Sequence, residues 1–232
     1  YGHTKGVLAF DSDSNSGFWL IHSWPKFPDF SQDKYTTEPA SIDYGQSYLC
    51  ISITDYNTFN TMAYQIRYMS PYVYASNNMF SDTNNFSMIL DKEWLQETSI
   101  MKLNPYDKNV FTHFAKSRSW DNDLYEYLVS PALNTGFYWE TWRRQEPEPS
   151  FCKPEYKYDS INVNYVKFND GTTWKYTVDH SKIGTSMIDN WVCIGGINRM
   201  YTQYNRSGGT ACFRFENFWY ALNASFYQTD SC

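Results

Sequence analysis

Two short motifs hold the residues of this chain that are best suited to chemistry. Each places a histidine two residues before a lysine: His3 and Lys5 in the first motif, His180 and Lys182 in the second. On an extended segment, residues i and i+2 share a face, so the imidazole and the ammonium group point the same way. An imidazole nitrogen can attack phosphorus or transfer a proton, and a lysine can neutralise phosphate oxygens. Two such pairs facing each other would supply a nucleophile, a general acid and two cations, with no metal required.

Residues close to the second pair add further candidate functions. Asp179 precedes His180 and could orient its imidazole, and Asn198 could donate to a phosphoryl oxygen. The neighbouring Arg199 is a candidate phosphate contact. Gly208 and Gly209 form a turn sequence whose backbone amides could bind an anion. The simpler interpretations stay open, because a single His-x-Lys is common on polar surfaces and Gly-Gly is common in plain hairpin turns.

Composition limits the class of protein. The 232 residues are 42% hydrophobic and 20% aromatic, which excludes a disordered chain. No apolar run approaches the roughly 20 residues that span a bilayer, so we expect no membrane insertion. The formal net charge of −6 at pH 7 offers no help in binding a polyanion. Because four histidines charge and carboxylates protonate in acid, a polyanionic partner is more plausible at low pH.

Cysteines and glycosylation sequons point to the secretory route. The five cysteines include no C-x-x-C pair, so we expect no metal site. N-x-S/T sequons occur at Asn85, Asn205 and Asn223. Scattered cysteines together with sequons favour an oxidising compartment, hence a secreted or lysosomal protein. The odd cysteine must be free or must pair outside this chain.

Alternating and helical patterns predict the elements that position these motifs. Residues 5–11 and 16–23 are β-prone runs around a turn sequence, which predicts a hairpin. Residues 55–69 have helical spacing after an N-cap candidate, Asp55. Further helices are expected at 120–133, capped by Asp121 or Asp123, and at 218–227. Further strands are expected at 46–54, 108–117, 160–168, 172–178, 190–197 and 210–218, and a loop at 75–87. Strands interspersed with helices predict an α/β (α+β layered) fold.

Taken in order, several blocks of this sequence resemble the signature blocks of the deoxyribonuclease II family. They read "GHTKGVLAFD…GFWLIHSWPKFP", "YGQSYLC", "AKSRSWDNDLYEYL", "DHSK" and "CIGGINRM…GGTAC". The resemblance runs from His3 to Cys232 and so covers essentially the whole chain. It implies a phospholipase D-like, pseudo-dimeric sandwich of two β-sheet halves with flanking helices. Each half gives one His-x-Lys motif to a shared site. The proline-rich segment 143–156 suggests the division: 1–145 for the first half with connecting helices, and 146–232 for the second.

The same resemblance implies an activity and site residues. We expect a metal-independent acid endonuclease without cofactors, which cuts double-stranded DNA to 3′-phosphate ends through a phosphohistidine intermediate. By motif, the catalytic residues would be His3, Lys5, His180, Lys182 and Asn198. His180 is taken as the nucleophile and His3 as the general acid, although the sequence leaves the reverse order open. His22 matches the first family hairpin, so with Arg199, Gly208 and Gly209 it is assigned to substrate binding. His113 matches no family histidine, and a surface or packing role is expected.

The resemblance also implies the cysteine pairing. Cys152 would pair with Cys232, and Cys193 with Cys212. The family partner of Cys50 lies in a segment before the first motif, which suggests a partner in a missing N-terminal segment or a second chain. The first half of the fold would then be incomplete.

Two departures from the family pattern leave a second function open. Gly196 stands where the family motif has aspartate, and Ile183 with Gly184 replaces a Trp-Cys pair. A glycan on Asn205 would lie in the Gly208–Gly209 segment. The alternative is a catalytically impaired, secreted homologue that binds DNA or a host partner.

Overall fold

The fold is a layered α+β arrangement of a small and a large β-sheet. The computed structural model describes residues 1–25, 42–80, 83–103 and 110–232. The small sheet, in spatial order, contains β1 (Gly6–Asp11), β2 (Ser16–His22) and β3 (Tyr48–Ile53), all antiparallel. The predicted hairpin and the predicted strand at 46–54 are therefore confirmed.

The large sheet has nine strands, all but one of them in a single path. In spatial order the path runs through β12 (Phe226–Thr229), β7 (Ser160–Lys167), β6 (Phe137–Thr141), β9 (Lys182–Ser186), β10 (Trp191–Gly195), β11 (Gly208–Arg214), β5 (Phe111–Lys116) and β4 (Thr98–Leu103). β8 (Thr173–Lys175) pairs with β7 outside this path, and β6 with β7 is the parallel pair. Strands from both sides of residue 145 share this sheet, and the proposed division into halves stays a prediction.

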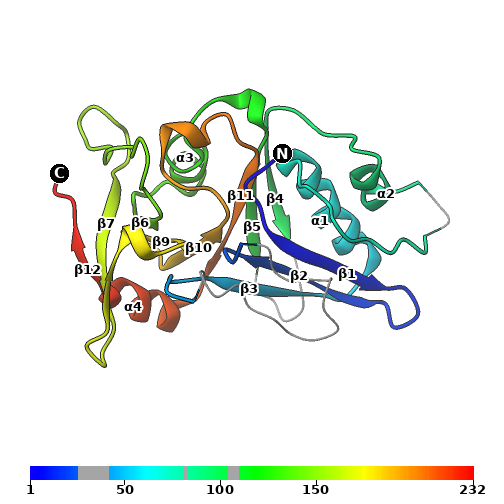
Figure 1. Cartoon of the computed structure of the whole chain (residues 1–232), viewed down its shortest axis with the longest axis horizontal. Helices are drawn as coiled ribbons and strands as arrows, with labels where there is room; N and C mark the ends of the chain where they lie inside the picture. The colour runs from blue at the N-terminus through cyan, green and yellow to red at the C-terminus, as the bar shows by residue number, and fades with distance from the viewer. Residues whose placement is uncertain (26–41, 81–82, 104–109) are drawn as a thin grey trace.

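Helices cover the large sheet on both faces (Figure 1). They are α1 (Tyr56–Met69), α2 (Asn85–Leu90), α3 (Ser130–Leu133), which continues a wide π-type turn over Tyr125–Val129, and α4 (Glu216–Ser225). One face is covered by α1, α4 and the small sheet, as the apolar clusters of these elements show. The π-type turn and α3 cover the other face, around Phe114, Trp139 and the Cys193–Cys212 pair.

Local signals explain where the helices begin. The Asp55 side chain accepts a hydrogen bond from the backbone N–H of Thr58, so the predicted N-cap of α1 is confirmed; such a cap contributes about 1 kcal/mol. Asp123 in the same way accepts from the N–H groups of Tyr125 and Glu126. The prediction of a loop over 75–87 is wrong at its end, because Asn84 and Ser87 form a capping box that begins α2.

Both predicted disulfides are present. Cys193 and Cys212 lie directly opposite each other on β10 and β11, and Cys152 bonds to Cys232. Cys50 is free and exposed on β3, so the expected partner for it is not borne out.

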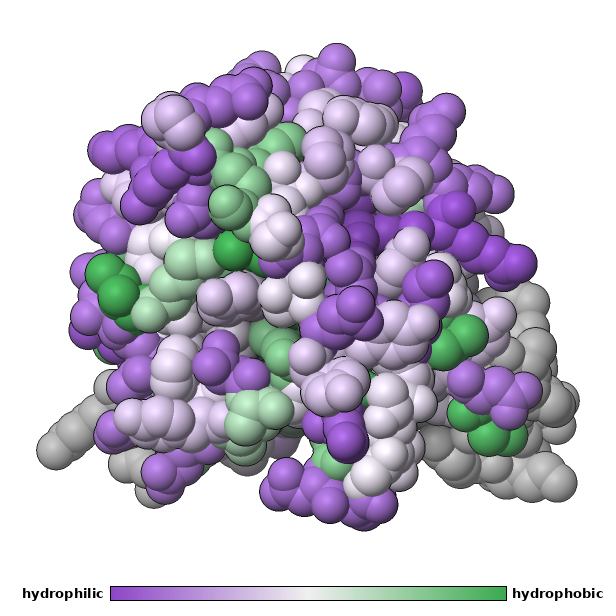
Figure 2. Space-filling view, turned by 90° about the vertical axis from the view of Figure 1, so that its left-hand side faces the viewer, coloured by the Kyte–Doolittle hydropathy of each residue, from purple (hydrophilic) through white to green (hydrophobic). Residues whose placement is uncertain are grey.

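In the described part of the chain no helix is long and apolar enough to cross a membrane. Polar residues dominate the face on the side of β12 and β7, where apolar spots are small and scattered (Figure 2).

Candidate active site

The two His-x-Lys pairs lie at the beginning of two strands that belong to different sheets. His3 and Lys5 immediately precede β1, and His180 immediately precedes β9, whose first residue is Lys182. In each pair the lysine Nζ donates to the backbone carbonyl of its own histidine: Lys5 to His3 at 3.0 Å, and Lys182 to His180. The shared contact folds each lysine back beside its imidazole.

The His3 ring is held by the segment that follows β10. Its Nδ1 lies 2.5 Å from the carbonyl oxygen of Gly196, and its backbone N–H donates to the carbonyl of Ser207. A Cβ on Gly196 would lie 3.3 Å from the Cα of Thr4, so this segment passes directly against the first motif. The contact uses a backbone carbonyl, so it is independent of the side chain at position 196.

The His180 ring is held by residues 44–46. Tyr44 stacks on it with centroids 4.2 Å apart and an interplanar angle of 15°, and Trp142 meets it edge-on. The amide nitrogen of Gln46 lies 3.3 Å from Nδ1, and the backbone N–H of His180 donates to the carbonyl of Gly45. Sequence reasoning missed Tyr44 and Gln46 as site residues, although both stand in the "YGQSYLC" block.

Electrostatics connect the two pairs. The pKa of His3 lies well below its usual value because of burial and the charges of Lys5 and Lys182. Burial, with the charges of Lys182 and Lys5, lowers the pKa of His180 to about 4. The charge of Lys182 thus acts on His3 and the charge of Lys5 acts on His180, so the two pairs are electrostatically coupled. Burial and Lys5 also lower the pKa of Lys182 to about 7.

The carboxylates near the second pair, Asp179 and Glu140, bond to neighbouring residues and not to the imidazole of His180. Asp179 accepts from Trp174 Nε1 at 2.5 Å and from the backbone N–H of Ser181, so it supports the loop and does not bond to the imidazole. Glu140 accepts from the Ser181 hydroxyl at 2.8 Å, and burial raises its pKa well above the usual value. The expectation that Asp179 orients His180 directly is therefore wrong.

Asn198, a predicted site residue, is buried two residues after Gly196, whose carbonyl faces His3. It is 1% exposed, and neither its amide nitrogen nor its amide oxygen has a hydrogen-bond partner among the described residues. Buried polar atoms are normally paired, so an unpaired amide beside Gly196 is suited to an incoming polar group. His22 is buried at the end of β2 and stacks on Tyr48, with the centroids 5.6 Å apart.

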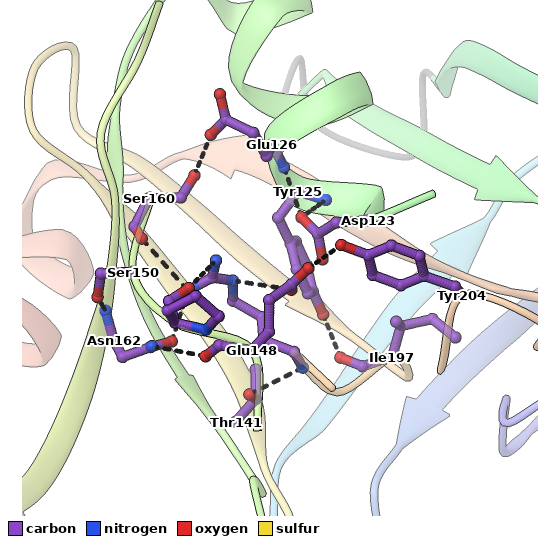
Figure 3. Close-up of polar contacts among 12 residues, drawn as sticks. Asp123, Tyr125, Glu126, Thr141, Glu148, Ser150, Ser160, Asn162, Ile197 and Tyr204 are labelled. Carbon is purple, nitrogen blue, oxygen red and sulfur yellow. Dashed lines mark hydrogen bonds and ion pairs between the residues drawn. The ribbon is translucent and has the colours of Figure 1, made fainter. Parts of the chain in front are cut away.

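Arg199 is not available to a phosphate. Its side chain is fully buried, donates to Asn162, Ser160 and Pro149, and forms an ion pair with Glu148 at 3.7 Å. Figure 3 shows the surrounding network, in which Tyr204 donates to Glu148 and Tyr125 donates to the carbonyl of Ile197. Burial and Asp123 raise the pKa of Glu148, and the charge of Arg199 opposes this shift. The predicted phosphate contact is corrected to a structural role: Arg199, the residue after Asn198, anchors the chain to the segment 148–162.

The two glycines also differ from the expectation. Gly208 and Gly209 are strand residues of β11, paired with Lys116 and Ala115, and form no turn. A Cβ on Gly209 would lie 2.8 Å from the His113 ring, so this glycine makes room for a buried histidine. His113 itself packs on Trp19, as the expected packing role requires.

The placements of Lys116 and of the three sequon asparagines bear on phosphate contact and on glycosylation. Lys116 is buried and donates to the carbonyl of Tyr204, so it does not reach a phosphate at the surface. Asn205 is exposed, whereas Asn85 and Asn223 use their amides in contacts with Asn60 and Thr185. Glycosylation at all three stays a prediction.

Comparison with known proteins shows the family of this chain. The family model of deoxyribonuclease II matches residues 1–232. Deoxyribonuclease-2 of Caenorhabditis elegans is 37% identical over 96% of this chain and 60% of its own length. Cell death-related nuclease 6 of the same organism is 33% identical over 100% of this chain and 64% of its own. Deoxyribonuclease-2-alpha of Mus musculus is 30% identical over 97% and 65%.

These matches identify the family. The architecture is a layered α+β fold in which the two His-x-Lys pairs lie at the beginning of strands of different sheets. The chain belongs to the deoxyribonuclease II family. It spans somewhat less than two thirds of the length of the curated relatives named above.

Proposed function

We propose that this protein is a metal-independent acid endodeoxyribonuclease that cuts double-stranded DNA and acts in lysosomes or outside the cell. One observation carries the proposal: the charges of Lys5 and Lys182 each act on both His3 and His180. Two imidazoles and two ammonium groups are sufficient for phosphoryl transfer, with nucleophile, acid and charge neutralisation all supplied by side chains. The printed names of the relatives, deoxyribonuclease-2 and nuclease, favour DNA as the phosphodiester.

The hydrogen bonds of the two rings favour a division of labour. A carbonyl oxygen only accepts, so the contact with Gly196 requires a proton on His3 Nδ1. Neutral His3 then has its Nε2 lone pair free to attack phosphorus. The amide nitrogen of Gln46 faces Nδ1 of His180, which leaves the proton of neutral His180 on Nε2. We therefore propose His3 as the nucleophile and His180 as the general acid, the reverse of the order taken from the sequence.

The reaction then proceeds in two displacements. Nε2 of His3 forms a bond to phosphorus while the bond from phosphorus to O5′ breaks, and protonated His180 gives its Nε2 proton to O5′. A water molecule next attacks the phosphohistidine, the phosphorus–nitrogen bond breaks, and His180 takes the proton of that water. The products are a 5′-hydroxyl and a 3′-phosphate. Lys5 and Lys182 neutralise the non-bridging oxygens, and the unpaired amide of Asn198 donates to one of them.

An acidic working range follows from the shifted pKa values. The mechanism needs neutral His3 and protonated His180. Burial and the lysine charges hold the pKa of His180 near 4, so its protonated fraction rises as the pH falls toward that value. The pKa of His3 is also well below its usual value, so His3 stays neutral into the acidic range. A bound phosphate raises both values, because its negative charge favours the imidazolium form.

Plasmid nicking in EDTA at pH 5 tests the function. The wild type is expected to convert supercoiled plasmid to nicked circles with 3′-phosphate ends, and His180→Ala to lose this activity. Lys167→Ala, at an exposed lysine near the end of β7, is the matched control and should cleave like the wild type. Absence of cleavage by the wild type at every pH, with DNA binding retained, would overturn the proposal in favour of the impaired DNA-binding homologue.

A further inference from the structure

A short polar chain leads from the small sheet to His180. The hydroxyl of Ser23 donates to the side-chain oxygen of Gln46 at 2.5 Å, and the amide nitrogen of Gln46 lies 3.3 Å from His180 Nδ1. Gln46 is thus the residue between a serine that follows β2 and the imidazole that precedes β9. Within the described residues, it is the side chain with a hydrogen bond to this ring.

The backbone around Gln46 is fixed on both sides. Ser23 and Ser47 exchange two hydrogen bonds, from Ser23 N–H to the Ser47 carbonyl and from Ser47 N–H to the Ser23 hydroxyl. On the other side, Gly45 forms an isolated β-bridge with Asp179. A Cβ on Gly45 would lie 2.6 Å from the Asp179 carboxylate, so the two segments are in close contact. The glutamine therefore reaches the ring from a rigid support.

The charged groups described around His180 do not bond to its Nδ1, which faces the amide of Gln46. Lys182 and Lys5 disfavour the imidazolium, and Asp179 favours it. Both oxygens of Asp179 are already hydrogen-bonded, to Trp174 and to the Ser181 N–H. Among the described residues, Tyr44 and Trp142 also contact this ring, through their own aromatic rings.

We propose that Gln46 is a positioning residue that holds Nδ1 of His180 in both of its protonation states, so that Nε2 faces the leaving oxygen and is the nitrogen that gives up and regains the proton. In the neutral ring, the amide N–H donates to bare Nδ1. When Nδ1 gains a proton, rotation of the amide brings its oxygen to accept that proton. The Ser23 hydroxyl tolerates either orientation, because a hydroxyl can donate to the amide oxygen or accept from the amide nitrogen. This role rests on the proposed function of His180 as the general acid.

A glutamine differs from a carboxylate at this position in a way that can be measured. A carboxylate beside an imidazole favours the charged form and raises its pKa, whereas a neutral amide orients the ring with little effect on its charge. With Gln46 at this position, burial and the two lysines still lower the pKa of His180, so His180 is protonated only in acid.

Two variants and a control separate this role from a purely structural one. Gln46→Glu should raise the pKa of His180 by about 1–2 units and move the alkaline limb of the kcat/KM profile by the same amount. Gln46→Ala should lower kcat roughly tenfold with little change in KM, because orientation is lost and substrate contacts are not. Gln228→Glu makes the same charge change on the outer strand β12, three strands from β9 in the sheet, and should leave the profile unchanged.

Nitrogen-15 NMR of the histidine side chains gives a readout that does not depend on cleavage. Neutral His180 is expected as the Nε2–H tautomer in the wild type and as a mixture of tautomers in Gln46→Ala. An unshifted His180 pKa in folded Gln46→Glu, or an Nδ1–H tautomer in the wild type, would overturn the inference. If the wild type fails to cut DNA, the proposed function fails, while the tautomer and the titration still decide the role of Gln46.

Discussion

The two His-x-Lys pairs share one local geometry and differ in what holds each ring. In both, the lysine donates to the carbonyl of its own histidine. The Nδ1 of His3 faces a backbone carbonyl from the segment after β10, while the Nδ1 of His180 faces a side-chain amide from the segment before β3. A carbonyl permits one proton arrangement and an amide permits two. Equal motifs can therefore take unequal chemical roles.

The supports of the two rings are also exchanged between the sheets. His3 precedes β1 of the small sheet and is held by Gly196, which follows β10 of the large sheet. His180 precedes β9 of the large sheet and is held by Tyr44 and Gln46, which precede β3 of the small sheet. Each ring is thus positioned only when the two sheets are packed together. We infer that assembly of the site and packing of the sheets are one event.

Replacing each histidine by alanine should have the largest effect and separates the two roles. On DNA, His3→Ala and His180→Ala should each lower kcat by about 10³-fold or more, because catalytic residues that act as a unit lose most of their effect when any one of them is removed. On a phosphodiester with a p-nitrophenolate leaving group, which needs no acid, the variants should differ. His180→Ala should release a burst of one nitrophenolate per enzyme and stall as the phosphohistidine, and His3→Ala should release none.

The burst is measured by stopped-flow absorbance, and the trapped phosphate by alkaline gel analysis with labelled substrate. A burst in His3→Ala and none in His180→Ala would restore the opposite order of roles. Circular dichroism of both variants controls for folding.

Replacing Lys5 or Lys182 by methionine should have the next largest effect, and the more buried lysine should show the larger loss of kcat/KM. Lys182 is 3% exposed and has a pKa of about 7, whereas Lys5 is only partly buried and has a pKa of about 8. Charge stabilisation is stronger where water is excluded, so Lys182→Met should lower kcat/KM about 10²-fold and Lys5→Met about tenfold. Removing a positive charge favours the imidazolium, so both variants should raise the pKa of His180.

The pH profile and NMR titration of the two lysine variants check this order. Equal losses, or a His180 pKa that falls in Lys182→Met, would contradict the electrostatic coupling between the pairs. Lys167→Met serves as the control for loss of a lysine charge elsewhere.

A third histidine, His113, gives the smallest predicted effect and acts on stability rather than catalysis. Its Nδ1 lies 3.0 Å from the side-chain oxygen of Gln65 in the core, and burial lowers its pKa to about 3. In the unfolded chain this histidine binds a proton near pH 6.5, but in the folded protein it stays neutral down to about pH 3. The free energy of unfolding is therefore unaffected by His113 above pH 6.5 and falls as the pH drops from 6.5 toward 3. At pH 5 the loss is about 2 kcal/mol.

Urea unfolding of His113→Gln at pH 7 and pH 5 tests this value. The difference in unfolding free energy between the two pH values should be smaller by about 2 kcal/mol than in the wild type. The same change at His180, which is only half-buried, should have a smaller effect. An unaltered pH dependence in His113→Gln would show that other groups dominate the acid response.

Local elements were predictable because local physics determines them. The hairpin of β1 and β2, the N-cap of α1 and α4 all follow from patterns within about fifteen residues. β4, β6 and β9 were not predicted, because they carry mixed polar and apolar residues whose burial depends on neighbouring strands. The capping box at Asn84 was overlooked within a run of polar residues typical of loops.

The sequence by itself determined the chemistry available: two His-x-Lys pairs, each with its lysine beside its own histidine, because i and i+2 of an extended chain share a face. Only the tertiary structure decided the surroundings. Gly196 lies 193 residues from His3 and Gln46 lies 134 residues from His180, separations at which no periodicity constrains contact. The tertiary structure also decides that Arg199 is buried in a network with Glu148 and that Gly208 and Gly209 lie in a strand. Such outcomes depend on how the sheets pack, and that is set by the whole apolar core.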